Sequence, residues 1–125
     1  MILKESGVWT YPSGRQVCDI RSTAGRAEYN RRIAAMHERQ KGLCCLSGHI
    51  EGCPGPLRLF EAVFEHQDGR GHGGGNQDDR IEVMKDGKLI WQNGAAHFVC
   101  NGLKGSRRID YNTALQARAG ELLAR

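Results

Sequence analysis

The chain contains few aromatic residues, little proline and no long apolar run. Phe, Trp and Tyr make up 6% of its 125 residues, and three residues are proline. No apolar run reaches about 18 residues, so we expect no transmembrane helix and no membrane partner. Residues 1–7 lack the apolar segment of a secretory signal, so we expect a reducing, cytoplasmic location. With 39% hydrophobic residues the core is thin, and a bound metal ion would stabilise so small a domain.

The number of cysteines is odd, and no two of them form a Cys-x-x-Cys pair. There are five of them, and in a reducing compartment this favours metal ligands or free thiols over disulfides. The glycine-rich residues 67–79 lack the Gly-Lys-Ser/Thr ending of a nucleotide-binding loop, which excludes that motif. The formal net charge of +4 suits a nucleic-acid partner, although many other proteins carry a similar charge.

The pattern along the chain predicts a single α+β domain with flanking helices. Residues 1–24 are predicted to form an irregular arm with short strands. Ser22 or Thr23 caps a helix over residues 27–40, which Gly42 ends. The other expected elements are a compact turn at 43–56, a strand at 57–64, a loop at 67–79, short strands at 81–84 and 89–92 joined by an Asp86-Gly87 turn, a helix at 94–103 capped by Asn93, and a terminal helix at 112–124 within the segment 111–125.

His97 and Cys100 are candidate ligands of a zinc ion. On the predicted helix they are three residues apart and lie on nearly one face, and zinc accepts an imidazole and a thiolate together. Two further ligands are expected from the turn at 43–56, which offers Cys44, Cys45, His49 and Cys53. Zinc closed by four such ligands is structural. The alternative is a set of buried free thiols without metal.

An acid and a histidine end the apolar residues 57–64, and an asparagine follows Cys100. The carboxylate of Glu65 and the amide oxygen of Asn101 suit a hard cation such as magnesium. Asn101 is one helical step, about 100°, from Cys100, so it is expected to point away from the zinc. His66 could take a proton from a water molecule. Adjacent strand residues point to opposite faces, so the strand must bend for Glu65 and His66 to reach one site.

Glu65-His66, Asn93 and His97-x-x-Cys100-Asn101-x-x-Lys104 together resemble the motifs of the HNH endonucleases, which have the ββα-metal (His-Me finger) fold. The resemblance covers residues 42–108 and implies a ββα-metal core at 43–108. Asn101 stands at the last motif position, which makes the chain a His-Asn-Asn variant. The chain looks like the small HNH proteins of phages and prophages, which implies the cytoplasm of a bacterium or of a phage-infected host.

The resemblance implies an endonuclease that hydrolyses DNA phosphodiester bonds with one divalent metal ion, Mg²⁺ or Mn²⁺. His66 would activate water, Asn93 would orient His66, and Glu65 with Asn101 would bind the catalytic ion. The DNA backbone would be contacted by basic residues, namely Arg70, Lys104, Arg107 and Arg108. A structural zinc would be bound by Cys44, Cys53, His97 and Cys100, with His49 or Cys45 as substitutes.

Two residues depart from the family pattern. Glu65 stands where Asp is usual, and Ser47 stands where the zinc knuckle usually has its second cysteine. The main alternative is a non-catalytic DNA-binding accessory that zinc holds together, active in phage packaging or regulation. A nuclease acting on RNA is another. Besides DNA, we expect a homodimer or phage packaging proteins as partners, because one active site per chain would need a second to cut both strands.

Overall fold

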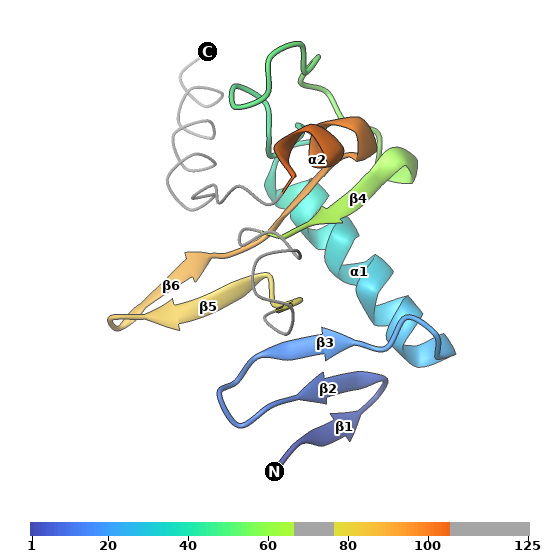
Figure 1. The fold of residues 1–125 in the computed structure, drawn as a ribbon, viewed down its shortest axis with the longest axis vertical. Coiled ribbons are helices and arrows are strands. Elements are labelled where there is room, and N and C mark those ends of the chain that lie inside the picture. The colour runs from blue at the N-terminus through green and yellow to red at the C-terminus, as the bar shows by residue number, and fades with distance from the viewer. Residues whose placement is uncertain (67–76, 106–125) are drawn as a thin grey trace.

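A three-stranded antiparallel sheet begins the chain in the computed structural model, which describes residues 1–66 and 77–105 (Figure 1). Its strands, in the order β1-β2-β3, are β1 (Leu3–Glu5), β2 (Val8–Thr10) and β3 (Gln16–Cys18). The β1–β2 turn is tight because Ser6 and Gly7 both have positive φ, of 51° and 78°. The expected arm with short strands is therefore a regular sheet.

Helix α1 (Thr23–Arg39) follows the sheet. Ser22 is its N-cap, since the Ser22 Oγ accepts a hydrogen bond from the Gly25 N–H at 3.0 Å. The predicted cap at Ser22 is confirmed, and with it the helix begins at Thr23 rather than at residue 27. At Gly25 the Asp19 carbonyl oxygen lies only 2.0 Å from where a Cβ would stand. The glycine therefore lets the end of the sheet pack directly on the first turn of α1.

The centre of the fold is an antiparallel strand pair followed by a short helix. β4 (Ala62–Glu65) pairs with β7 (Gly94–His97), with Glu65 opposite Gly94 and Ala62 opposite His97. α2 (Phe98–Lys104) continues directly from β7 and packs against both strands, and α1 also contacts both of them. The strand pair thus lies in contact with both helices.

Two predicted boundaries in this region are wrong. Residues 59–61 form the 3-10 helix η1 (Leu59–Glu61), so the strand predicted at 57–64 begins only at Ala62. The helix predicted at 94–103 begins only at Phe98, and the residue at its N-cap is His97 rather than Asn93. Residues 94–97 pair with β4 instead, because that pairing satisfies their backbone groups while the small Ala95 and Ala96 side chains are fully buried in the core.

A hairpin lies between β4 and β7 in the sequence. β5 (Glu82–Lys85) and β6 (Lys88–Trp91) are joined by Asp86 and Gly87, whose φ values are 53° and 76°. Positive φ at both central residues is the geometry of the tight turn that Asp-Gly favours. The predicted hairpin is confirmed, with its first strand one residue later and its second one residue earlier than expected.

The hydrophobic core gathers α1, the segment after it and the β4–β7 pair. Its buried members are Ile33, Met36, Cys44, Cys45, Leu46, Ile50, Leu57, Phe64, Ala95, Ala96 and Cys100. The chain is thus a small α+β protein, as predicted. In the described part of the chain, none of the helices combines the length and the apolar character needed to cross a membrane. The terminal helix predicted at 112–124 lies outside the described residues.

Candidate metal centre and histidine site

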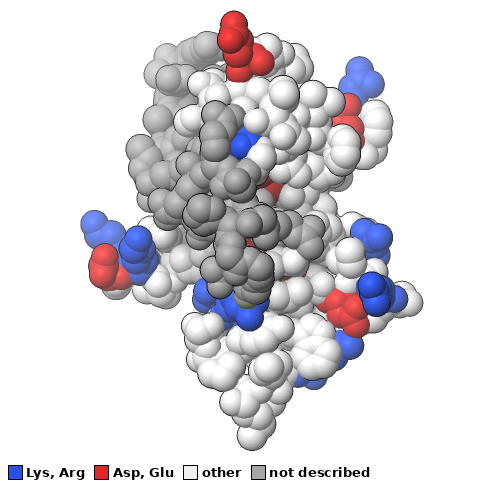
Figure 2. Space-filling model, viewed as in Figure 1, with Lys and Arg blue, Asp and Glu red and all other residues white. Residues whose placement is uncertain are grey.

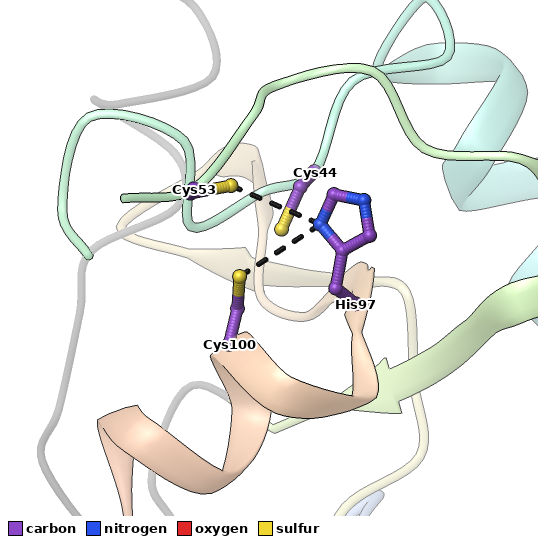
Figure 3. Close-up of side chains that lie close together, drawn as sticks. All are labelled: Cys44, Cys53, His97 and Cys100. Carbon is purple, nitrogen blue, oxygen red and sulfur yellow. Dashed lines mark hydrogen bonds between the residues drawn. The ribbon is translucent and has the colours of Figure 1, made fainter. Parts of the chain in front are cut away.

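Four candidate metal ligands come together near the start of α2 (Figure 3). Cys44 and Cys53 belong to the segment between α1 and η1, His97 ends β7, and Cys100 lies in α2. One ligand atom of each residue lies within 4.8 Å of those of the other three. These residues could hold a metal ion, and they are the zinc set expected from the sequence.

The distances in this cluster suit a tetrahedral ion. His97 Nδ1 lies 3.8 Å from Cys53 Sγ and 3.7 Å from Cys100 Sγ. Zinc bonds of about 2.3 Å to sulfur and about 2.0–2.1 Å to nitrogen would place such atoms roughly 3.6 Å apart. Small side-chain shifts would therefore complete the coordination.

A backbone carbonyl sets the tautomer of His97. His97 Nε2 lies 2.9 Å from the Pro56 carbonyl oxygen. A carbonyl oxygen only accepts hydrogen bonds, so Nε2 carries the hydrogen and the Nδ1 lone pair faces the thiols. A metal-ligating histidine commonly donates its other ring N–H in this way. The imidazole is therefore already oriented as a ligand.

Burial makes the thiolate forms of the cysteines costly. It raises the pKa of the Cys100 thiol from 9.0 to about 12, and it also raises the pKa of the Cys44 thiol. A divalent cation favours the deprotonated ligand and would offset that cost. Protonation of the cluster is therefore coupled to metal binding.

The segment that carries Cys44 and Cys53 folds back on itself. The Cys44 N–H donates to the Gly55 carbonyl at 2.8 Å, and Gly52 turns the chain just before Cys53 with a φ of 85°. This fold-back replaces the Cys-x-x-Cys knuckle that Ser47 excludes. The two substitutes considered lie outside the cluster: His49 is exposed, and Cys45 is buried with its sulfur against Gly94.

His66 follows β4 and is held by a buried carboxylate. Its Nε2 lies 2.7 Å from Asp79 Oδ1, and the side chains are 5% and 0% exposed. Phe64 stacks on the imidazole with ring centroids 4.7 Å apart, and Tyr29 stacks on Phe64 at 5.1 Å. Because a carboxylate accepts the Nε2 hydrogen, Nδ1 is the nitrogen of the neutral ring that could take a proton from water.

Asp79 is itself fixed by several donors. Its Oδ2 accepts the Cys18 N–H at 2.8 Å, and Gln77 Nε2 donates to both carboxylate oxygens, at 3.0 and 3.1 Å. Arg32 donates to the Asp79 carbonyl at 2.8 Å. The carboxylate therefore faces His66 in one orientation.

Asn93 holds the backbone on both sides of Asp79. Its Nδ2 donates to the Asp78 carbonyl at 2.7 Å and to the Arg80 carbonyl at 2.6 Å. These residues flank Asp79, so Asn93 holds the segment whose carboxylate contacts His66. The orienting role that the resemblance implies for Asn93 stays a prediction.

Glu65 points into the interior and pairs with Lys104. Lys104 Nζ donates to Glu65 Oε1 and, at 2.6 Å, to the His66 carbonyl oxygen. Both side chains are almost fully buried. The expected contact of Lys104 with DNA does not agree with this position, because burial separates the ammonium from a phosphate group at the surface.

Asn101 lies half-buried in α2, three residues before Lys104 and therefore on nearly the same helix face. Among the described residues, the His, Cys, Asp and Glu groups that could hold a metal ion do not include Glu65 or His66. A second metal centre at these residues is thus not preformed from such side chains.

Sequence reasoning missed the role of Asp79. Three aspartates, Asp68, Asp78 and Asp79, lie in the predicted loop 67–79 that follows His66, and nothing in their spacing distinguishes them. Only the folded chain selects one of them as the partner of the imidazole.

The charged surface is mixed. On the face shown in Figure 2, the described Lys and Arg side chains lie in separate groups, with Asp and Glu side chains near several of them. Arg39 pairs with Glu82 at 2.7 Å and Arg80 with Asp78 at 2.8 Å. Three predicted DNA contacts, Arg70, Arg107 and Arg108, lie outside the described residues.

No protein-family model matches the chain, and no curated protein or solved structure is similar to it at a significant level.

Proposed function

We propose that this chain is an HNH-type nuclease that hydrolyses phosphodiester bonds of DNA. The order β4, β7, α2 follows the strand, strand, helix order of the ββα-metal fold. The family has an acid-histidine pair at the end of its first strand, an asparagine before its helix and a last motif residue within the helix. Here Glu65 ends β4 and His66 follows it, Asn93 precedes α2 with β7 between them, and Asn101 lies in α2. This agreement of order and position supports the assignment.

The observation that carries the proposal is the pair formed by His66 and Asp79. A general base needs a fixed ring with one nitrogen directed at water, and a carboxylate on the other nitrogen stabilises the imidazolium that forms. In the proposed reaction, His66 Nδ1 takes a proton from water, and the resulting hydroxide attacks phosphorus. The bond from phosphorus to the 3′ oxygen breaks, and that oxygen leaves with a proton from the solvent. The Asp79 carboxylate accepts the Nε2 hydrogen bond and holds the ring in place.

The resemblance also implies Mg²⁺ or Mn²⁺ on Glu65 and Asn101. Lys104 already donates to the Glu65 carboxylate, so a positive charge lies beside the oxygens that would bind the ion. Two cations at one carboxylate repel each other strongly when water is excluded. The residues as arranged do not fit the ion, and we assign no step of the reaction to it.

The Cys44, Cys53, His97 and Cys100 cluster fits zinc with a structural role. Three sulfurs and one nitrogen are the soft and borderline donors that zinc prefers, and four protein ligands leave no position for water or substrate. The ion would hold the segment between α1 and η1 against the start of α2. It would thereby hold α2, whose Lys104 donates a hydrogen bond to the His66 carbonyl oxygen.

Replacing His66 by Ala tests the catalytic assignment. We expect plasmid cleavage to fall by about 10²- to 10⁴-fold, the range of general-base catalysis. The exposed His49 gives the matched control, because His49→Ala should cut at the wild-type rate. Circular dichroism and zinc content would show that both variants fold. Undiminished cutting by folded His66→Ala would exclude His66 as the base.

Parallel assays on DNA and RNA of the same sequence would identify the substrate. The proposal expects faster cleavage of DNA. Faster cleavage of RNA would show that RNA is the substrate. The roles proposed for His66 and Asp79 would not change.

One observation favours a second function, a DNA-binding accessory without catalysis. Glu65 and Lys104 neutralise each other inside the protein, and His66 is itself almost fully buried. Such an arrangement can also serve stability alone. This function predicts salt-dependent DNA binding by wild type and by His66→Ala alike, with no cleavage by either.

A further inference from the structure

Two oxygens at the end of β4 form a cation position. The Glu65 carboxylate and the His66 backbone carbonyl both accept hydrogen bonds from Lys104 Nζ, the second at 2.6 Å. Glu65 and Lys104 are each only 1% exposed. Carboxylate and carbonyl oxygens are also the ligands that hard divalent ions take. The Lys104 ammonium group therefore occupies a position whose oxygen ligands would suit Mg²⁺ or Mn²⁺.

We propose that Lys104 is the resident cation of this site, so that Glu65 binds no divalent ion while Lys104 is in place. Burial supports this, because a carboxylate removed from water needs a partner charge and Lys104 supplies it within the chain. An incoming ion would have to displace an ammonium that is itself buried. A catalytic role for this site rests on the proposed function. The position of Lys104 beside Glu65 and the His66 carbonyl does not, because the fold alone places it there.

The helix that carries Lys104 also carries a ligand of the candidate zinc centre. Cys100 and Lys104 are four residues apart in α2, one helical turn, and both are buried. Fixing Cys100 therefore fixes the position from which the lysine side chain reaches β4. Through its bond to the His66 carbonyl, Lys104 positions the backbone of the proposed base.

Manganese binding to the zinc-loaded 125-residue chain tests this proposal. Free Mn²⁺ gives an electron paramagnetic resonance signal that is lost on binding, so bound ions can be counted. Wild type and Glu65→Gln should take up equal amounts. Lys104→Met, which keeps the chain length and removes the charge, should gain one Mn²⁺ per chain. Lys104→Met combined with Glu65→Gln should lose that ion again.

Two outcomes would overturn the proposal. One is Mn²⁺ bound by wild type and lost in Glu65→Gln, a comparison that does not depend on how well Lys104→Met folds. The other is a Lys104→Met protein with normal circular dichroism and zinc content that binds no additional Mn²⁺. Both measurements need no substrate, so a protein that cuts no nucleic acid would overturn the proposed function and leave this result standing.

Discussion

Asp79 connects parts of the chain that are distant in sequence. Its two carboxylate oxygens accept hydrogen bonds from the Cys18 backbone, from Gln77 and from His66. Donors therefore face both oxygens. One carboxylate thus joins β3 to the residue that follows β4.

Asp79→Asn should destabilise the protein although it preserves shape. Whichever way the amide is turned, its NH₂ group meets donors and leaves a buried hydrogen bond unmade, at a cost of about 1–3 kcal/mol. Urea denaturation would measure this loss. Asp86→Asn is the matched control and should be nearly neutral, since Asn-Gly suits the β5–β6 turn as well as Asp-Gly does.

Gly94→Ala should also destabilise the fold. A Cβ at Gly94 would lie 2.7 Å from the Cys45 Cβ and 2.8 Å from its sulfur, so β7 or the segment after α1 would have to move. Overpacking of this kind costs about 1–3 kcal/mol. Gly102→Ala, in the helix α2 with nothing within 4 Å, should instead stabilise by up to about 1 kcal/mol. Equal melting temperatures for the two variants would contradict this account.

Among individual residues, the sequence predicted correctly those whose side chains have a narrow range of roles in proteins. A histidine three residues from a cysteine has a narrow range of roles, so residue types and spacing identified His97 and Cys100 as candidate ligands. The resemblance selected Cys44 and Cys53 from the four candidates in the turn. Lys104 and Asp79 are common charged residues whose partners depend on packing. Their burial could not be read from neighbouring residues, so the DNA contact predicted for Lys104 does not agree with its buried position.

Among the elements, β7 shows how tertiary contacts override local preference. Residues 94–97 contain two alanines, the best helix formers, and the preceding asparagine is a good cap. The chain nevertheless extends these residues along β4, where the pairing satisfies their backbone groups. The β5–β6 turn and the Ser22 cap were predictable because they depend only on local backbone geometry.

Helix α1 should contribute a pH-dependent part of the stability through Glu28. Hydrogen bonds from Arg31, with Arg32 also contributing, lower the pKa of Glu28 from 4.5 to about 2. Since the folded-state pKa is the lower one, this stabilisation is fully present above about pH 4.5 and is lost as the pH falls towards 2.

Glu28→Gln should therefore be less stable than wild type at pH 7, and the difference should shrink at pH 3.5. The expected difference at pH 7 is at most about 1 kcal/mol, because water screens pairs on a helix surface. Free energies of unfolding at the two pH values would measure it. Glu51→Gln, which alters an exposed carboxylate, is the control. A difference that does not change with pH would indicate lost packing rather than lost charge.

For the whole molecule, the candidate metal centre joins segments on either side of the β5–β6 hairpin. We expect the purified protein to contain about one zinc per chain and to lose its cooperative thermal transition when a strong chelator removes the ion. In zinc-finger peptides the ion supplies about 10–16 kcal/mol, which exceeds the stability of most small domains.

Cysteine variants separate the metal from simple packing. Cys53→Ala should lower both zinc content and melting temperature. Cys18→Ala, at a buried cysteine outside the cluster, should keep one zinc per chain. A zinc content unaffected by Cys53→Ala would exclude Cys53 as a ligand.

The same centre has a consequence for a chain cut in two. A break of the backbone in the Asp86-Gly87 turn would leave Cys44 and Cys53 on one fragment and His97 and Cys100 on the other. The β4–β7 pairing and the β5–β6 pairing would each also cross the break. Co-expressed halves should therefore reassemble in the presence of zinc, and a chelator would separate them. The metal centre would then act as a reversible junction between two polypeptides.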